Sequence, residues 1–303
     1  MRNRSTFRQV VRSRCASMLC AALLAFGSRA VAIPAWPAAA ASTQEQAAAP
    51  RVAKVEPREW WTGYYSPVMV LLYGENLARA RFVVKYPGVT IDRVQLEADG
   101  KHAFVWLKLG AKAKPGKLTL QMKTAAGATR VEIMLRQRPS QAGKYQGITP
   151  NDVVYLIMPD RFADGNAANN QPPGAAPKTY DRTNPRAYHG GDLKGIQDHL
   201  PYLHDLGVTA LWLTPLYEND DSSSDYHGYH AVDEYAVEDH FGSMTDLQSL
   251  VASAHRLGMK IVLDMVPNHV GPKHPWAASQ PDPGWLHGTP AHHLNNTDYN
   301  FLP

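Results

Sequence analysis

The spacing of apolar and polar positions changes after Pro150 and divides the chain into two regions. From Val52 to Arg138, short apolar-rich runs alternate with turn residues such as Pro87-Gly88 and Asp99-Gly100, a pattern typical of strands. About seven strands are expected, which suit a β-sandwich of roughly 90 residues. These predicted strands are Val52–Val55, Val68–Tyr73, Phe82–Val84, Val89–Leu96, Phe104–Leu109, Leu118–Met122 and Val131–Leu135.

After Pro150 strands and helices alternate. Leucine and isoleucine recur at helical spacing from Leu193 to Leu206, and Pro201 should divide this stretch into two pieces, lying in the first turn of the second. A later helix should begin after Ser243, its N-cap, and end at Gly258. The β-α-β-α-β order predicts a parallel sheet. Its strands are expected at Val153–Met158, Ala210–Leu213 and Lys260–Val266.

Polar residues cluster where the last predicted strand ends, in the segment LDMVPNHV, residues 263–270. Ile261, Val262 and Leu263 show no period-two alternation, which suits a parallel strand covered on both faces. Asp264, Asn268 and His269 come at its carboxyl end, which is the active-site side of a (β/α) barrel. An isolated Asn-His pair would more simply be a turn and a core histidine, but this position favours a functional site.

The first 32 residues have the features of a secretory signal peptide. Five arginines precede the apolar run Met18–Gly27, and Ala30-Val31-Ala32 is a candidate cleavage site. About ten apolar residues are too few to span a bilayer, which needs ~20. Both cysteines lie in this leader, so the mature chain would have neither a disulfide nor a cysteine metal site. A secreted or periplasmic location is expected, with residues 33–50 as a flexible linker.

The leader also explains the basic character of the chain. It contains six arginines and no acidic residue, and removing them from 31 basic and 27 acidic residues leaves a net charge of −2. Nucleic-acid binding requires a clustered basic face. Nucleic acid is therefore not an expected partner.

Several segments together resemble the α-amylase family of glycoside hydrolases, glycoside hydrolase family 13. They are LDMVPNHV, YHGYH at 226–230, DRFADGNAANN at 160–170, and an opening VEP motif followed by Trp60-Trp61 and Gly63. The opening is similar to the N-terminal domain of cyclomaltodextrinases and neopullulanases. Although paired tryptophans can stack on sugars, packing is the expected role of Trp60 and Trp61.

This resemblance implies a multidomain fold. Residues 51–140 would form an all-β, immunoglobulin-like sandwich, and residues 150–270 the first part, about three strands, of a (β/α)8 catalytic barrel. Residues 271–303 would begin the loop domain inserted after strand three. A homodimer through the N-terminal domain is a further implication for the full-length form.

The segment DRFADGNAANN is the strongest metal signal of the chain. Side-chain amides and carboxylates gather around Gly165, and oxygen ligands of this kind suit Ca²⁺, although a solvated Asn-rich turn is the simpler alternative. The resemblance implies a calcium loop here, and Asn268 would bind a second calcium. The ligands of the first would be the side chains of Asp164, Asn166, Asn169, Asn170 and Asp192 and the carbonyl of Gly190.

The resemblance also assigns substrate contacts. Tyr229 would stack on the sugar ring about to be cleaved, His269 would hydrogen-bond the same sugar, and His227 would be a weaker contact. Asp264 would be a buried carboxylate that organises the site.

Zinc is not expected, because His292-His293 lack the spacing of a helical zinc pair and no HExxH occurs. Four further histidines are expected to be solvated surface groups: His240, His255, His274 and His287.

The implied activity is cleavage of α-1,4-glucosidic bonds in cyclodextrins, pullulan or maltooligosaccharides by retaining double displacement. Retaining glycosidases use two carboxylates about 5 Å apart. In this family they come from later strands than the three predicted here, so no catalytic residue is expected in this chain, which alone should be inactive. The alternative is a truncated, non-catalytic product with at most weak calcium or glucan binding.

Overall fold

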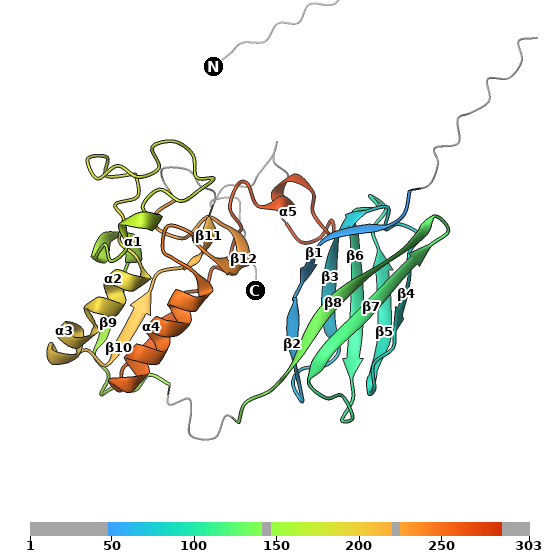
Figure 1. Ribbon diagram of the computed structural model, residues 1–303, viewed down its shortest axis with the longest axis horizontal. Coiled ribbons are helices and arrows are strands. Elements are labelled where there is room, and N and C mark those ends of the chain that lie inside the picture. Colours follow the sequence, from blue (N-terminus) through green and yellow to red (C-terminus); the bar gives the residue numbers. More distant parts are fainter. Residues whose placement is uncertain (1–47, 141–146, 220–224, 287–303) are drawn as a thin grey trace, which may run out of the picture. The chain divides into compact units, whose positions relative to one another are not determined.

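The computed structural model describes residues 48–140, 147–219 and 225–286 (Figure 1). The predicted signal peptide, residues 33–47 of the linker and residues 287–303 lie outside these ranges, as do His287, His292 and His293.

The first region is a sandwich of two four-stranded sheets. Alternate side chains such as Val70, Leu72, Leu118 and Ile133 point between the sheets and form one buried core. One sheet has the order β1 (Arg51–Glu56), β3 (Val68–Glu75), β6 (His102–Leu109), β5 (Val89–Leu96). The other has the order β2 (Glu59–Thr62), β8 (Gly127–Gln137), β7 (Gly116–Thr124), β4 (Arg81–Val84).

The sandwich has one strand more than the sequence predicted. The additional strand β2 lies at the edge of its sheet and pairs in parallel with β8, which places Trp61 opposite Arg136. A four-residue strand with two adjacent tryptophans is too short to show the alternation of apolar and polar residues by which a strand is recognised in a sequence. Trp60 packs against the core while Trp61 remains 37% exposed, so the packing role expected for the pair holds for Trp60.

The second region contains the predicted parallel sheet. β9 (Val154–Ile157), β10 (Ala210–Leu213) and β13 (Lys260–Leu263) lie in the order β13-β10-β9, with both pairings parallel. Its helices and shorter elements are α1 (Pro159–Phe162), η1 (Ala167–Asn169), α2 (Leu193–Asp198), α3 (Leu200–Asp205), β11 (Tyr217–Asn219), β12 (Ala231–Val237), α4 (Met244–Arg256) and α5 (Pro275–Ala278). The fold class predicted from the sequence, a sandwich followed by the first three strands of a barrel, is confirmed.

The helix boundaries follow the predicted signals. α2 and α3 are separate helices, and Pro201 lies in the first turn of α3, where its missing N–H is not needed. Ser243 caps α4 by accepting the N–H of Asp246, whose carboxylate accepts the N–H of Ser243 in return.

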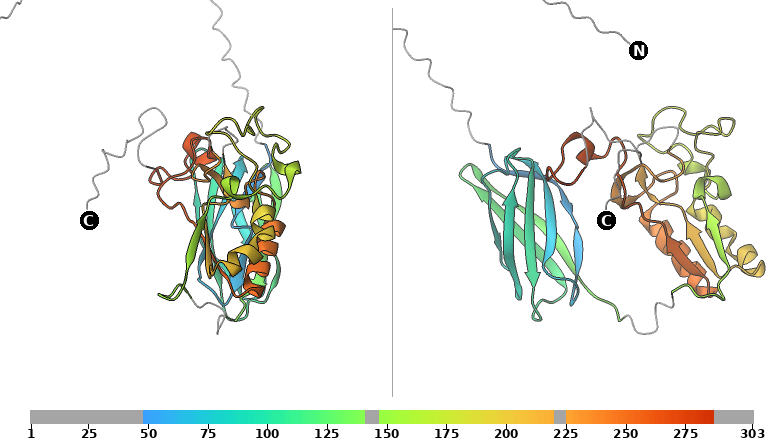
Figure 2. Two further views of the ribbon diagram at one scale, coloured as in Figure 1. Left: turned by 90° about the vertical axis from the view of Figure 1, so that its left-hand side faces the viewer. Right: turned by 180° about the vertical axis from the view of Figure 1, so that it is seen from behind.

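The helices cover one face of the parallel sheet. Ile157, Leu211 and Leu250 share a buried core with α2, α3 and α4, which lie alongside β9 and β10 (Figures 1 and 2). On the opposite face Leu156 is 57% exposed and Trp212 is 41% exposed. In a closed (β/α) barrel that second face is the interior.

Two features differ from the sequence-based expectation. β13 ends at Leu263 and not at Val266, and Leu263 is 54% exposed, so this strand is not covered on both faces. Leu263 is the register partner of Leu213, which is fully buried, so the helices of the described ranges cover this face at β10 and leave it exposed at the end of the edge strand β13. The sequence also did not predict the antiparallel pair β11 and β12. Polar residues and two register shifts interrupt the alternation of apolar and polar positions along these strands.

Asp152 ties together the amino ends of the strands. Its carboxylate accepts hydrogen bonds from Lys260 Nζ at 2.8 Å and Thr209 Oγ1 at 2.9 Å, and the Lys260 ammonium holds the pKa of Asp152 well below its usual range. A lowered pKa means that this stabilisation is present above the unfolded pKa of about 3.9 and is lost as the pH falls below it.

We therefore expect Asp152→Asn to lower Tm at pH 7 and to weaken the acid-induced loss of stability. Thermal unfolding at a series of pH values, followed by circular dichroism, measures both effects. Asp205→Asn on the exposed end of α3 is the matched control. Identical Tm profiles for wild type and Asp152→Asn would contradict the assigned role.

Candidate active site at the carboxyl ends of the parallel strands

A tight turn at residues 225–230 fixes the predicted sugar-binding tyrosine. The N–H of Gly228 donates to the carbonyl of Asp225 at 3.0 Å. Gly228 has φ +85°, and a Cβ atom there would lie 2.0 Å from the carbonyl oxygen of Pro215, so the turn requires glycine. The Arg161 guanidinium lies 3.8 Å from the centre of the Tyr226 ring, a cation–π contact. These contacts fix the turn against the segments that follow β9 and β10.

Tyr229 and Asp264 are in direct contact. The hydroxyl of Tyr229 donates to Asp264 Oδ2 at 2.8 Å, and Trp212 Nε1 lies 3.3 Å from the same oxygen. Burial and the hydrogen bond to Asp264 raise the pKa of Tyr229, so its phenol stays protonated. Trp212 is the register partner of Val262, and Asp264 lies two residues after Val262. Side chains two residues apart on a strand point to the same face, so Asp264 and Trp212 share the face that is the interior of a closed barrel.

Asp264 is half-buried, not buried as expected, because it lies just beyond the end of edge strand β13. Trp212 was not identified from the sequence. The sequence does show a tryptophan, with its indole N–H, on the predicted strand β10. Its contact with Asp264 can be recognised only once the register of β10 and β13 is known.

The backbone of Tyr229 is held on both sides by predicted site residues. Its N–H donates to His227 Nδ1 at 3.0 Å, and its carbonyl oxygen lies 2.8 Å from His269 Nε2. Burial, and then the neighbouring His230, lower the pKa of His227, which favours the neutral ring that this hydrogen bond needs. The structure thus brings His227, Tyr229, Asp264 and His269 together, and a sugar hydroxyl would compete with the Tyr229 carbonyl for His269.

The predicted calcium loop is attached to α2 through Asp192. This fully buried carboxylate caps α2 by accepting the N–H of Gly195 at 2.6 Å, and it also accepts the N–H groups of Gly165 and Asn166. Asn166 in turn accepts the N–H of Ala168 and caps η1. Asp192 and Asn166 therefore shape the loop whether or not they bind a metal.

Oxygen atoms without partners remain on the other side of this loop. Asp164 Oδ2 accepts a hydrogen bond from Asn170 Nδ2 at 2.8 Å, whereas Oδ1 of Asn169 and Oδ1 of Asn170 are buried and have no hydrogen-bond partner within the described residues. Gly190 is adjacent, since a Cβ atom there would lie 2.6 Å from Asn170 Oδ1. Buried polar atoms normally have partners. Two unpaired amide oxygens in a loop that also carries a carboxylate fit a hard cation such as Ca²⁺.

Asp160 positions Gly190 and was not identified from the sequence. Its buried Oδ1 accepts the N–H groups of His189 at 2.8 Å and Gly190 at 3.2 Å, and its Oδ2 lies 2.8 Å from Arg161 Nε. Burial raises the pKa of Asp160 despite these contacts.

Asn268 has a single described side-chain contact, from its Nδ2 to His269 Nδ1 at 3.3 Å. The second calcium site expected there stays a prediction, because the following loop segment extends beyond the described residues.

Two histidines expected at the surface are buried. His240 is 2% exposed, contacts Glu238 at 2.6 Å through Nδ1 and stacks on Tyr188 with ring centres 3.8 Å apart. His274 is 4% exposed and lies 3.4 Å from Glu234. A nearby carboxylate makes the burial of each imidazole tolerable, and the sequence did not reveal these pairs.

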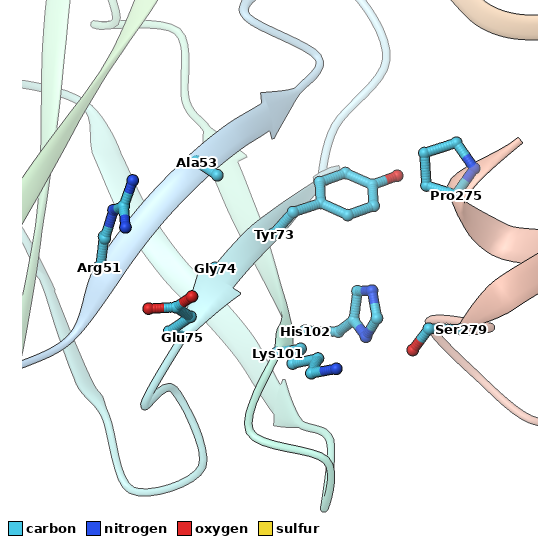
Figure 3. A pocket seen from close by; sticks show the side chains of 9 residues that line it. All are labelled: Arg51, Ala53, Tyr73, Gly74, Glu75, Lys101, His102, Pro275 and Ser279. Carbon is cyan, nitrogen blue, oxygen red and sulfur yellow. The ribbon is translucent and has the colours of Figure 1, made fainter.

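A hollow on the sandwich is bordered by Arg51, Tyr73, Glu75, Lys101 and His102 (Figure 3). None of the site residues predicted from the sequence borders it. We assign it no function.

Comparison with known proteins identifies both regions. Residues 54–139 match the family described as cyclomaltodextrinase, N-terminal, and residues 156–297 match the family described as alpha amylase, catalytic domain. The class of protein is therefore a β-sandwich that is similar to a cyclomaltodextrinase N-terminal domain, followed by a region that is similar to part of an α-amylase catalytic domain. More particularly, the chain is similar to the N-terminal portion of cyclomaltodextrinase and neopullulanase type members of the α-amylase family.

Individual relatives match part of the chain. Neopullulanase 2 of Thermoactinomyces vulgaris is 45% identical over 120 residues, which are 39% of this chain and 20% of the relative. A cyclomaltodextrin glucanotransferase of Klebsiella oxytoca is 40% identical over 125 residues, 39% of this chain and 19% of the relative. A solved α-amylase structure from Anoxybacillus has 44% identity and a TM-score of 0.41, covering 45% of this chain and 28% of its own. The chain spans about a fifth of the length of these curated relatives.

Within the described ranges, the structure has no helix with the length and apolar character needed to cross a membrane.

Proposed function

We propose that this chain is the N-terminal portion of a secreted or periplasmic glycoside hydrolase that cleaves α-1,4-glucosidic bonds. The observation that carries the proposal is the arrangement around Tyr229, whose hydroxyl, N–H and carbonyl contact Asp264, His227 and His269 in turn. All of these residues follow parallel strands at the end where (β/α) barrels place their active sites.

In the proposed mechanism this chain supplies sugar binding. The Tyr229 ring offers an apolar face to one sugar, and His269 donates to a hydroxyl of the same sugar as the oxocarbenium-like transition state forms. Asp264 holds the phenol so that the ring is in place before substrate arrives, which reduces the entropic cost of reaching the transition state. The nucleophile and the acid/base are supplied by later strands of the barrel, which complete a retaining double displacement.

The names of the relatives support the substrate class. Neopullulanase and cyclomaltodextrin glucanotransferase refer to pullulan and to cyclodextrins. Cyclodextrins, pullulan and maltooligosaccharides are accordingly the proposed substrates.

Calcium is proposed to be structural. Asp164, Asn169 and Asn170 would bind Ca²⁺ through side-chain oxygens and Gly190 through its carbonyl, with Asp192 and Asn166 shaping the loop. The bound ion would hold the loop after β9 against the start of α2. It takes no part in the bond cleavage.

The test is to compare two proteins. One is the complete enzyme, in which the reading frame continues into the remaining barrel strands; the other is residues 33–303 alone. We expect the complete enzyme to hydrolyse β-cyclodextrin or pullulan and to release products in the α configuration, detected by proton NMR. Residues 33–303 should show no turnover above buffer and poor solubility, because the face bearing Leu156 and Trp212 is exposed.

Two results would contradict this proposal. One is α-glucan hydrolysis by residues 33–303 alone, since the three strands are assigned no nucleophile. The other is a complete enzyme that leaves every one of these glucans intact.

A further inference from the structure

Three potential metal ligands meet in the turn that carries Tyr229. Asp225, His227 and His230 each place one ligand atom within 4.8 Å of the others. Asp225 is 1% exposed, and the two histidines are half-buried. The cluster lies outside the predicted calcium loop, and its two histidines do not have the spacing of a helical zinc pair.

The cluster is held in place before any metal binds. His230 Nδ1 lies 2.6 Å from Asp225 Oδ1, and the His230 N–H donates to Asn219 Oδ1 at 3.0 Å. The His227 and His230 rings are nearly perpendicular, with an interplanar angle of 81° and centres 4.9 Å apart. Gly228 between them is fixed against Pro215. A ligand set that needs little rearrangement loses little entropy on binding.

We propose that Asp225, His227 and His230 form a binding site for a late first-row divalent metal ion such as Zn²⁺. Two imidazoles and a carboxylate suit Zn²⁺ or Cu²⁺ and do not suit Ca²⁺, which prefers oxygen ligands. Tetrahedral zinc with bonds of about 2.1 Å places its ligand atoms about 3.4 Å apart. Small side-chain shifts therefore bring the three groups around one ion and leave a fourth position for water.

Metal binding at this cluster competes with the hydrogen bond from the Tyr229 N–H to His227. In a neutral imidazole one nitrogen carries a proton and the other accepts. His227 accepts the Tyr229 N–H through Nδ1, so a metal on Nδ1 replaces that bond, and a metal on Nε2 moves the proton to Nδ1. If the proposed hydrolase function holds, Zn²⁺ therefore inhibits the complete enzyme, whereas the binding measurement below does not depend on that function.

The first experiment is calorimetric titration of the complete enzyme with Zn²⁺ at saturating Ca²⁺, which keeps the calcium loop filled. We expect one Zn²⁺ per chain, at least tenfold weaker binding in His230→Gln and His227→Gln, and unchanged binding in His204→Gln, an exposed control on α3. The double variant His292→Gln/His293→Gln tests the adjacent histidine pair near the carboxyl end. Failure of wild type to bind Zn²⁺, wild-type affinity in His230→Gln, or loss of binding in the double variant overturns the proposal.

A gain of signal separates ligand loss from misfolding. In His230→Cys the new thiolate should bind Co²⁺ and produce a near-ultraviolet thiolate-to-cobalt charge-transfer absorption. His204→Cys should show no such absorption. If the two cysteine variants give the same cobalt spectrum, position 230 is not a ligand and the proposal is wrong.

Discussion

Tyr229→Ala and His269→Ala are each expected to reduce kcat/KM of the complete enzyme by a factor of about 30 to 1000. This corresponds to about 2–4 kcal/mol of transition-state stabilisation, the scale seen when one positioned active-site donor is removed. The loss should appear mainly in kcat, because contacts that strengthen in the transition state contribute little to substrate binding. Initial rates on a maltooligosaccharide over a range of concentrations separate the two parameters.

The contacts of Tyr229 allow a graded test. Tyr229→Phe retains the ring and loses the hydroxyl that donates to Asp264, so it should lose less activity than Tyr229→Ala. Tyr202→Ala and His204→Ala, both exposed on α3, are matched controls and should retain wild-type kinetics. Equal kinetics for Tyr229→Ala and Tyr202→Ala would contradict the assigned role.

Calcium is expected to raise the stability of the complete enzyme, and Asp164→Ala should remove most of this increase. A ligand that binds only the folded state stabilises it by about 2.7 kcal/mol at a hundredfold excess over Kd. Asp164 supplies a carboxylate oxygen in contact with Asn170, whose own oxygen is unpaired, and its loss also leaves Asn170 Nδ2 without its acceptor. Thermal unfolding with Ca²⁺ and with a chelator measures the difference.

The control for this experiment is Asp205→Ala, which removes an exposed carboxylate from α3 and should keep the calcium-dependent rise in Tm. A wild-type Tm that is the same in calcium and in chelator would show that the loop is only a turn.

Elements set by local chemistry were predictable from the sequence. Pro201 divides α2 from α3, and Ser243 begins α4, because proline and N-cap residues act on the backbone beside them. The parallel order of β9, β10 and β13 followed from the alternation of helices and strands. β2 was missed because its identity depends on pairing with β8, about 75 residues away in the sequence.

The candidate site was predictable only in part. Sequence motifs identified Tyr229, His269 and Asp264, but not that Asp264 is the acceptor for the Tyr229 hydroxyl. Trp212 joins them because β10 and β13 are in register, a property of the sheet and not of any one segment.

Buried polar pairs were the least predictable feature. Asp160 holds the backbone of His189 and Gly190 across 29 and 30 positions, and His240 is buried against Glu238 and Tyr188. Aspartate is mostly exposed in proteins and histidine is intermediate, so the sequence gives no reason to expect either to be buried. Only the folded chain shows which partners compensate for the loss of water.

The most direct test of the central claim is a crystal structure of the complete enzyme with a bound maltooligosaccharide. The account predicts one sugar ring stacked on Tyr229 at about 4 Å and hydrogen-bonded to His269 at about 3 Å. Asp264 should remain bonded to the Tyr229 hydroxyl in that complex. An oligosaccharide bound in the active site with no sugar ring touching both Tyr229 and His269 would contradict the account.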